Sequence, residues 1–152
     1  MARLNLDRST LPAFIDRVRA MRADTPRQWG TMDSTRAIRH LIFTFEMSLG
    51  IQQIKDTSKP IARDLIYLLF FRWFTNWPKG KIKGPDFVTP PPKGNFESEQ
   101  AKLLRIMSQF VDELERNPAK TGVNPGLGTI TLAKWSRVHG VHNDHHLRQF
   151  GV

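Results

Sequence analysis

Apolar residues recur at intervals of three and four along most of this chain, and this spacing constrains the fold more than any other feature. It is the period of an amphipathic α-helix that buries one face. Five stretches show it, from Ser9 or Thr10 to Arg22, from Asp33 or Ser34 to Gly50, from after Ser58 to before Pro78, from Phe96 to Asn117, and from Thr129 or Thr131 to Phe150. No stretch shows the alternation of strands joined by hairpin turns. The sequence therefore predicts an all-α helical bundle.

The apolar pattern predicts a different degree of burial for each helix. The second has a wide apolar face, and the centre of the third, Asp64 to Phe74, is apolar on nearly every side, so we expect both to be central. The fourth should turn polar residues such as Glu99 towards water. The Pro- and Gly-rich connection from Pro78 to Asn95 is long enough to cover one end of the bundle. Pro118 to Ile130 is expected to be a second loop.

Composition limits the class of protein. A chain of 152 residues suits one domain, residues 1–152. The net charge is +9, but the arginines are scattered through the helical patterns, which favours a solvated basic surface over an anionic-ligand site or a nucleic-acid interface. There is no cysteine, so a transition-metal site would have to use histidine and carboxylate.

The sequence carries no membrane or export signal. Met1 to Asp7 lacks the apolar run of a leader peptide. The most apolar run, Leu65 to Phe71 with Trp73 and Phe74 beyond it, is far shorter than the ~20 residues that cross a bilayer. We therefore expect a soluble, cytoplasmic protein without a membrane partner.

Four of the five histidines lie in the last predicted helix. One stripe of that helix holds Trp135, His139, His142, His146 and Phe150. His142 and His146 are one turn apart, so their rings can reach the same ion, whereas His145 lies off the centre of the stripe. His40 lies within the apolar second helix.

Imidazoles on an inward face are poorly solvated and must find hydrogen-bond partners, stay neutral or bind a cation. A lone inward histidine such as His40 is more often a satisfied core residue. The His142 and His146 pair fits metal ligation, but the same spacing also arises by chance in a histidine-rich helix end. The pattern alone leaves both interpretations open.

Three segments of the chain resemble the DinB superfamily. The run from Trp135 to Gly151 ends in His-x-x-His-His-x-x-Gln-Phe-Gly, which is similar to the last helix of small, largely uncharacterised members. The segment Trp29 to Leu41 is similar to their second-helix motif, and Asn124 to Trp135 resembles their His-Pro-x-x-Gly segment. Order and spacing agree along most of the chain.

This resemblance implies a DinB-like four-helix bundle of the up-down-down-up type, with an extra short N-terminal or connecting helix. It implies a metal triad of His40, His142 and His146, a divalent ion of the zinc or nickel type, and a homodimer. The chain departs from the pattern at Asn124, where relatives commonly have histidine. No role for that side chain is carried over.

Three imidazoles around one ion would leave a position open for water or substrate. The resemblance implies a metal-dependent hydrolase or a thiol-dependent transferase that acts on a small molecule, and it does not choose between them. No general base is evident, because Asn143 and Asp144 separate the paired histidines. His139, His145 and Gln149 are candidates for holding the ligand rings or moving protons, with packing as the alternative.

Other polar and aromatic residues have simpler interpretations. Asp33 is predicted to cap its helix, and Glu46 to be a solvated or paired carboxylate. The hydroxyl of Tyr67 needs a partner in the third helix. Trp73 and Trp77 are either core residues or the rim of a pocket.

Three classes of function follow from these observations. The first is a metal-dependent enzyme, and the second is a non-catalytic bundle that binds a small ligand with or without metal. The third is a nucleic-acid-associated protein, which the scattered basic residues do not support.

Overall fold

The computed structural model describes residues 4–82 and 84–152. Its helices are α1 (Leu11–Ala20), α2 (Ser34–Ser48), α3 (Pro60–Tyr67), a π-helical segment (Leu68–Trp73), a 3₁₀ turn (Asp86–Val88), α4 (Phe96–Arg116) and α5 (Leu132–Gln149), and its strands are β1 (Thr121–Asn124) and β2 (Gly128–Thr131). The first three residues, with the start of the segment considered for a leader, lie outside the described residues. The described chain is mostly helical and has one small two-stranded sheet.

Short polar side chains start the long helices. Asp33 accepts a hydrogen bond from the amide of Arg36, and Thr131 accepts one from the amide of Lys134. Asn95 caps α4 in the same way. Each cap satisfies an amide that has no partner within its own helix. The sequence left two possible starts for each of these helices, Asp33 or Ser34 and Thr129 or Thr131. The structure shows that Asp33 caps α2 and Thr131 caps α5.

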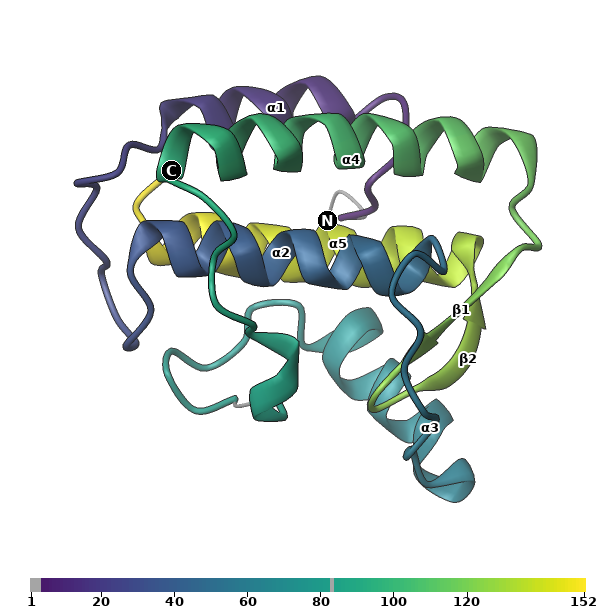
Figure 1. Ribbon diagram of the computed structural model, residues 1–152. Coiled ribbons are helices and arrows are strands. Elements are labelled where there is room, and N and C mark those ends of the chain that lie inside the picture. Colours follow the sequence, from purple (N-terminus) through teal and green to yellow (C-terminus); the bar gives the residue numbers. More distant parts are fainter. Residues whose placement is uncertain (1–3, 83) are drawn as a thin grey trace.

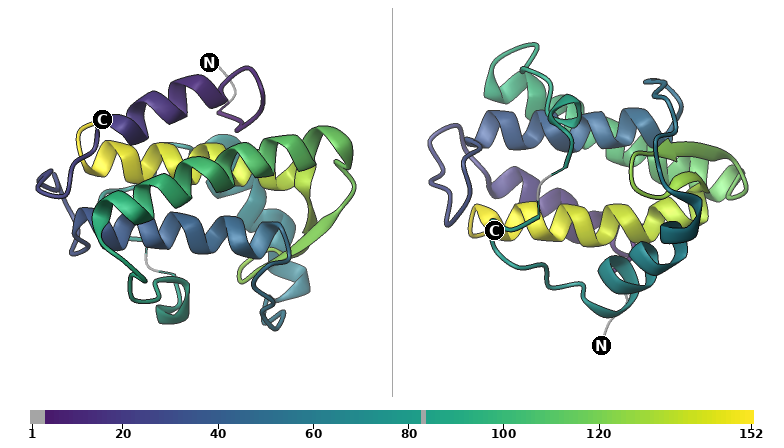
Figure 2. Two further views of the ribbon diagram at one scale, coloured as in Figure 1. Left: turned by 45° about the horizontal axis from the view of Figure 1, so that its top comes forward. Right: turned by 90° about the horizontal axis from the view of Figure 1, so that it is seen from below.

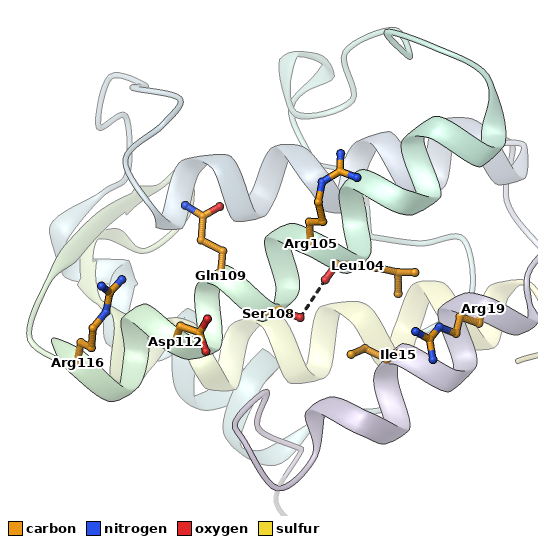
Figure 3. A pocket seen from close by; sticks show the side chains of 8 residues that line it. All are labelled: Ile15, Arg19, Leu104, Arg105, Ser108, Gln109, Asp112 and Arg116. Carbon is orange, nitrogen blue, oxygen red and sulfur yellow. Dashed lines mark hydrogen bonds between the residues drawn. The ribbon is translucent and has the colours of Figure 1, made fainter.

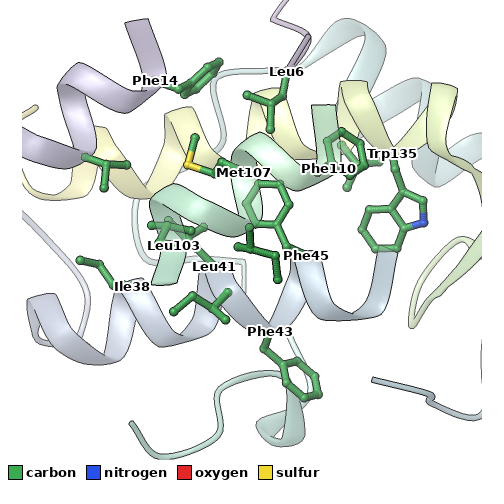
Figure 4. Close-up of a cluster of buried hydrophobic side chains, with 14 of the residues drawn as sticks. Leu6, Phe14, Ile38, Leu41, Phe43, Phe45, Leu103, Met107, Phe110 and Trp135 are labelled. Carbon is green, nitrogen blue, oxygen red and sulfur yellow. The ribbon is translucent and has the colours of Figure 1, made fainter. Parts of the chain in front are cut away.

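Four helices pack side by side around the core. α2 packs against α4 and α5, and α1 packs against α4 and α5 from the other layer. Figures 1 and 2 show α1 and α4 on one side of the molecule and α2 and α5 on the other. Their facing side chains, together with Leu6 of the segment before α1, form the buried cluster in Figure 4, which includes Phe45, Leu103, Phe110 and Trp135.

The N-terminal segment is fastened along α5. The amide of Leu6 donates to the carbonyl of Ser136, and the hydroxyl of Ser136 donates back to the carbonyl of Leu6. A methyl group at Gly140 would overlap the backbone of Leu4, so glycine is what allows this close approach. The contact fixes the middle of α5.

The segment predicted as a second loop contains a β-hairpin, so the all-α prediction was wrong there. β1 and β2 pair antiparallel, with Thr121 opposite Thr131 and Asn124 opposite Gly128. The side chain of Asn124 accepts from the amides of Gly126 and Leu127, which closes the turn. Strands of four residues are too short to show a reliable alternation in sequence.

The third helix is not central, which contradicts the prediction from its apolar character. α3 has no buried residue, and the π-helical segment after it buries only Phe71. A helix that is apolar on nearly every side is normally buried. Here no other described segment covers its outer face, and Ile61, Leu65 and Leu68 are 100%, 56% and 38% exposed. No helix in residues 4–82 and 84–152 is both long and apolar enough to cross a membrane.

Glu99 is also placed differently from the prediction. It lies in the interior, 3% exposed, instead of facing water. Its carboxylate accepts hydrogen bonds from the amides of Lys93 and Gly94, at the end of the long connection. Both donors bond to Oε1, whereas Oε2 is buried without a hydrogen-bond partner among the described residues, so the amides replace only part of the water that the carboxylate loses.

A buried ionic cluster joins α2 to α4. Arg39 is 2% exposed, and its Nη2 lies 2.9 Å from Oε2 of Glu46. The other carboxylate oxygen, Oε1, lies 2.6 Å from Nζ of Lys102. Burial by itself would raise the pKa of Glu46, but the hydrogen bonds from Arg39 and Lys102 outweigh it and lower the pKa below its usual value.

We expect Glu46→Gln to lower the free energy of unfolding by about 3 kcal/mol, because Arg39 would stay buried without a counter-charge. The lowered pKa means that the ionised carboxylate stabilises the fold above the ordinary glutamate value and that this contribution is lost as the pH falls through the lower folded value. The deficit of the variant should therefore shrink in acid. Denaturant unfolding at a series of pH values measures it.

Glu113→Gln is the matched control. Its carboxylate pairs with Arg116 and Lys120, which are more exposed to solvent, so the cost should stay below about 1 kcal/mol. A deficit for Glu46→Gln that is constant from neutral pH to strongly acidic pH would contradict the ionic role of Glu46.

Candidate metal centre

Three histidines from two helices meet at one point in the interior. α2 supplies His40, and α5 supplies His142 and His146 one turn apart. Nε2 of His142 lies 2.9 Å from Nε2 of His40 and 3.1 Å from Nε2 of His146. One ring nitrogen from each residue falls within 4.8 Å of the others. The structure thus brings together the three residues that the sequence proposed as ligands.

The outer nitrogen of His40 is held by the long connection. Its Nδ1 lies 2.8 Å from the carbonyl oxygen of Val88, which can only accept a hydrogen bond. Nδ1 must therefore carry the proton, and Nε2 is left with a lone pair that faces the other two rings. The Pro78 to Asn95 connection, through the 3₁₀ turn at Val88, packs against the back of this imidazole.

The outer nitrogen of His146 is held by Gln149. Nδ1 lies 3.0 Å from Oε1 of Gln149, while Nε2 of Gln149 donates to the carbonyl of Trp29 at 2.8 Å. The second bond fixes which end of the amide is the oxygen, so His146 also donates from Nδ1. Gly30, with φ of 82°, leaves room for this amide, because a side chain there would overlap Nε2 of Gln149.

These two hydrogen bonds determine which of the three inner ring nitrogens can carry a proton. With both outer nitrogens protonated, His40 and His146 direct lone pairs towards His142. Nε2 of His142 carries at most one proton and can donate it to one neighbour. At least one close nitrogen–nitrogen contact then has no hydrogen between its atoms, and a shared cation satisfies all three.

The donor set and its spacing fit a transition-metal ion. Zinc–nitrogen bonds of about 2.1 Å at a tetrahedral angle place two ligand nitrogens about 3.4 Å apart. The two measured separations, 2.9 and 3.1 Å, are slightly shorter than this. A set of imidazoles without sulfur suits zinc, nickel or copper better than magnesium or calcium.

Burial keeps the three rings neutral, which is the protonation state that a ligand needs. His40 and His146 are 7% and 8% exposed, whereas His142 is only partly buried. Loss of solvation lowers the pKa of all three imidazoles, and the neighbouring rings lower the pKa of His142 and His146 further.

His139 is set apart from the cluster in the core. Its ring stacks on Phe45, with centroids 3.9 Å apart, and on Trp135 at 5.0 Å. The hydroxyl of Ser48 donates to the carbonyl of Phe45, so its oxygen accepts from Nε2 of His139 at 2.9 Å. His139 is therefore Nε2-protonated, the opposite of the two histidines above.

His145 lies directly beside the cluster. Its ring centroid is 5.2 Å from that of His146 and 5.3 Å from that of Trp77. Its Nδ1 is buried and has no hydrogen-bond partner among the described residues. Trp77 also contacts His142 and donates its indole N–H to the carbonyl of Phe70, so it forms one wall of the site. Trp73, in contrast, is 65% exposed.

The carboxylates considered as bases are engaged elsewhere. Asp33 caps α2, and Glu46 belongs to the ionic cluster with Arg39. Asp144 pairs with Arg17 and Arg148. Tyr67 is half-buried, with Nζ of Lys134 over its ring.

One surface hollow lies away from the histidines. It has a volume of about 420 Å³ and opens between α1 and α4 (Figure 3). Its lining residues are Ile15, Arg19, Leu104, Arg105, Ser108, Gln109, Asp112 and Arg116. No histidine contributes to it, so it is not an entrance to the cluster.

The two hydrogen-bond networks predict the tautomer of each ring in metal-free protein near neutral pH. Long-range ¹H–¹⁵N correlation spectra should show His40 and His146 protonated at Nδ1, because both donate to an oxygen acceptor there. His139 should be protonated at Nε2 in the same spectrum and serves as the internal control. Nε2 protonation of His40 or His146 would contradict the arrangement described here.

Comparison with known proteins gives one family. The family model described as "Protein of unknown function (DUF1569)" matches residues 1–151, nearly the whole chain. No curated protein matches the chain. No solved structure matches it either. Because the match covers far more than half of the sequence, the chain belongs to the DUF1569 family of proteins of unknown function.

Proposed function

We propose that this protein binds one divalent transition-metal ion, zinc or nickel, through Nε2 of His40, His142 and His146. The observation that carries the proposal is the direction of the lone pairs. The carbonyl of Val88 and the amide of Gln149 take the outer protons of two rings and leave three inner nitrogens facing one point. A protein interior tolerates this arrangement best with a cation between them.

The surroundings support a reactive site better than a closed structural one. Three protein ligands leave at least one coordination position open for water or a substrate. A bound ion would polarise a ligand or lower the pKa of a bound water. Trp77 covers one flank of the rings, and the unpartnered Nδ1 of His145 is the nearest group that could accept or donate a proton.

The family relationship is also part of this proposal. We infer that the chain is a DinB-like four-helix bundle formed by α1, α2, α4 and α5, with α3 as the additional helix. The order of the three histidines along the chain and the packing of these four helices support it. One buried cluster with members from Leu6 to Phe150 supports a single domain over residues 1–152.

A protein with this metal site could have either of two functions. The first is a metal-dependent hydrolase or thiol-dependent transferase acting on a small molecule, which the resemblance implies. The second is a non-catalytic bundle that holds a small ligand at the metal. The second fits the carboxylates, because Asp33, Glu46 and Asp144 are all held in other contacts.

Metal content tests the proposal directly. Protein purified without a histidine tag and loaded with zinc should hold about one ion per chain after dialysis. His142→Ala and His40→Ala should each hold much less, because both remove a nitrogen from the cluster. The loaded protein should also unfold at a higher temperature than the metal-free protein, since only the folded chain assembles the site.

His139→Gln is the control within the same helix. Glutamine can still donate to Ser48, and no ligand is removed, so the variant should bind zinc like the parent protein. Equal zinc content in the parent and in His142→Ala would refute the proposal, as would a parent protein that binds no ion.

Activity separates the two functions. If the site is catalytic, zinc- or nickel-loaded protein should turn over activated esters, amides or thiol-acceptor substrates, and His145→Gln should bind metal normally but react more slowly. The expected loss is about 10²-fold for a group that transfers a proton. Stoichiometric metal without turnover of any of these substrate classes would favour the non-catalytic function.

A further inference from the structure

Residues 88–94 contact the histidine cluster at one end and the start of α4 at the other. At the first end, Nδ1 of His40 donates to the carbonyl of Val88 at 2.8 Å, and the hydroxyl oxygen of Thr89 lies 3.2 Å from the same nitrogen. Figure 1 shows this part of the chain rising from the 3₁₀ turn below α2 to the start of α4 above it. A movement of this segment would therefore reach the back of the His40 ring directly.

The other end of the segment is held by Glu99. Oε1 of this carboxylate accepts hydrogen bonds from the amide of Lys93 at 2.6 Å and from the amide of Gly94 at 3.1 Å. A methyl group at Gly94 would overlap the hydroxyl of Ser98, so glycine lets the segment lie this close to the first turn of α4. Glu99 is 3% exposed, and α4 packs along α2, so this anchor is fixed relative to the core.

Three consecutive prolines separate the two contacts. The rings of Pro90, Pro91 and Pro92 lock φ at about −65°, and a proline also restricts the residue before it. A run of prolines therefore has few conformations available and behaves as a semi-rigid spacer instead of a slack loop. The place of its end at Glu99 thus determines the place of its end at Val88.

The carboxylate of Glu99 does more than start a helix. Asn95 already caps α4 by accepting from the amide of Ser98. Oε2 of Glu99 is buried without a hydrogen-bond partner among the described residues, and such an oxygen destabilises a fold. The bonds from Lys93 and Gly94 therefore add something that capping does not need, which is a fixed position for the segment that leads to His40.

We propose that residues 88–94 form a rigid strut through which Glu99 positions His40 for metal binding. The strut holds the Val88 carbonyl against Nδ1, so the proton stays on Nδ1 and the lone pair of Nε2 stays directed at the other rings. Glu99 is thus a positioning residue, because it contacts neither the histidines nor the ion position. The effect on metal affinity rests on the proposed function, whereas the effect on the tautomer of His40 requires no ion.

Removal of the anchor is the first test. Glu99→Leu should lower the affinity for zinc, measured by competition with a chromophoric chelator, by about tenfold or more, as expected for a partner that orients a ligand. Glu99→Gln keeps an oxygen that accepts from both amides, so its affinity should stay within about threefold of that of the parent protein. Val111→Ala is the control for lost stability, since Val111 is buried in the same helix but roughly 18 Å further along it. Its affinity should equal that of the parent.

A variant with Pro90→Gly, Pro91→Gly and Pro92→Gly tests the stiffness separately. It keeps Glu99 and the length of the segment but makes the segment flexible. Its affinity for zinc should fall about as far as that of Glu99→Leu. Adding Glu99→Leu to this variant should lower the affinity little further, because both changes interrupt the same connection. Losses that add in full would overturn the proposal, and so would a loss in Val111→Ala as large as that in Glu99→Leu.

The tautomer of His40 in metal-free protein tests the strut without an ion. In Glu99→Leu and in the glycine variant, part of the His40 population should become protonated at Nε2, while His146 keeps its Nδ1 proton because Gln149 still accepts it. An unchanged His40 in both variants, or an equal change at His146, would overturn the strut. If the parent binds no zinc but His40 alone responds, the metal proposal fails and the strut is supported.

Discussion

Two hydrogen bonds, from Nδ1 of His40 to the Val88 carbonyl and from Nδ1 of His146 to Gln149, determine the tautomers of the histidine cluster. Each bond fixes the tautomer of a buried imidazole. Together they leave the Nε2 lone pairs of His40 and His146 facing His142. Neutral imidazoles cannot satisfy one another in that arrangement. The capacity of the three rings to hold a cation thus depends on the partners at the back of the rings as much as on the rings themselves.

The rest of the fold serves to keep those partners in place. The Asp33 cap and the buried pair of Arg39 with Glu46 fix α2, and the N-terminal segment is fastened along α5 at Ser136. The backbone at Trp29 and Gly30 holds Gln149, which in turn holds His146. Elements far apart in sequence therefore determine the direction of two ring nitrogens.

Much of this could be predicted from sequence because it follows from local periodicity. The helices, the caps at Asp33 and Thr131, and the pairing of His142 with His146 come from spacing along single helices. His40 was joined to that pair only by the resemblance to the DinB superfamily. The side-chain amide of Gln149 was also a candidate partner. Local pattern had no means of showing that it bonds to Nδ1 of His146, because that depends on the backbone of Trp29.

The rest depended on contacts that leave no mark in the sequence. The partner of His40 is a backbone carbonyl, and any residue at Val88 would supply one. Four-residue strands escape a search for alternation, and Glu99 looks like a surface residue because the donors that satisfy it are amides. The apolar pattern of α3 was interpreted as a central position, although its face is uncovered in a single chain.

X-ray absorption spectroscopy at the zinc edge of the loaded protein would identify the side chains that hold the ion. We expect three imidazole nitrogens at about 2.0–2.1 Å from the ion, with the outer-shell scattering of three imidazole rings. The pattern of three rings should be lost when His146 is replaced by alanine. A spectrum with one imidazole or none, or one that this substitution leaves unchanged, would contradict it.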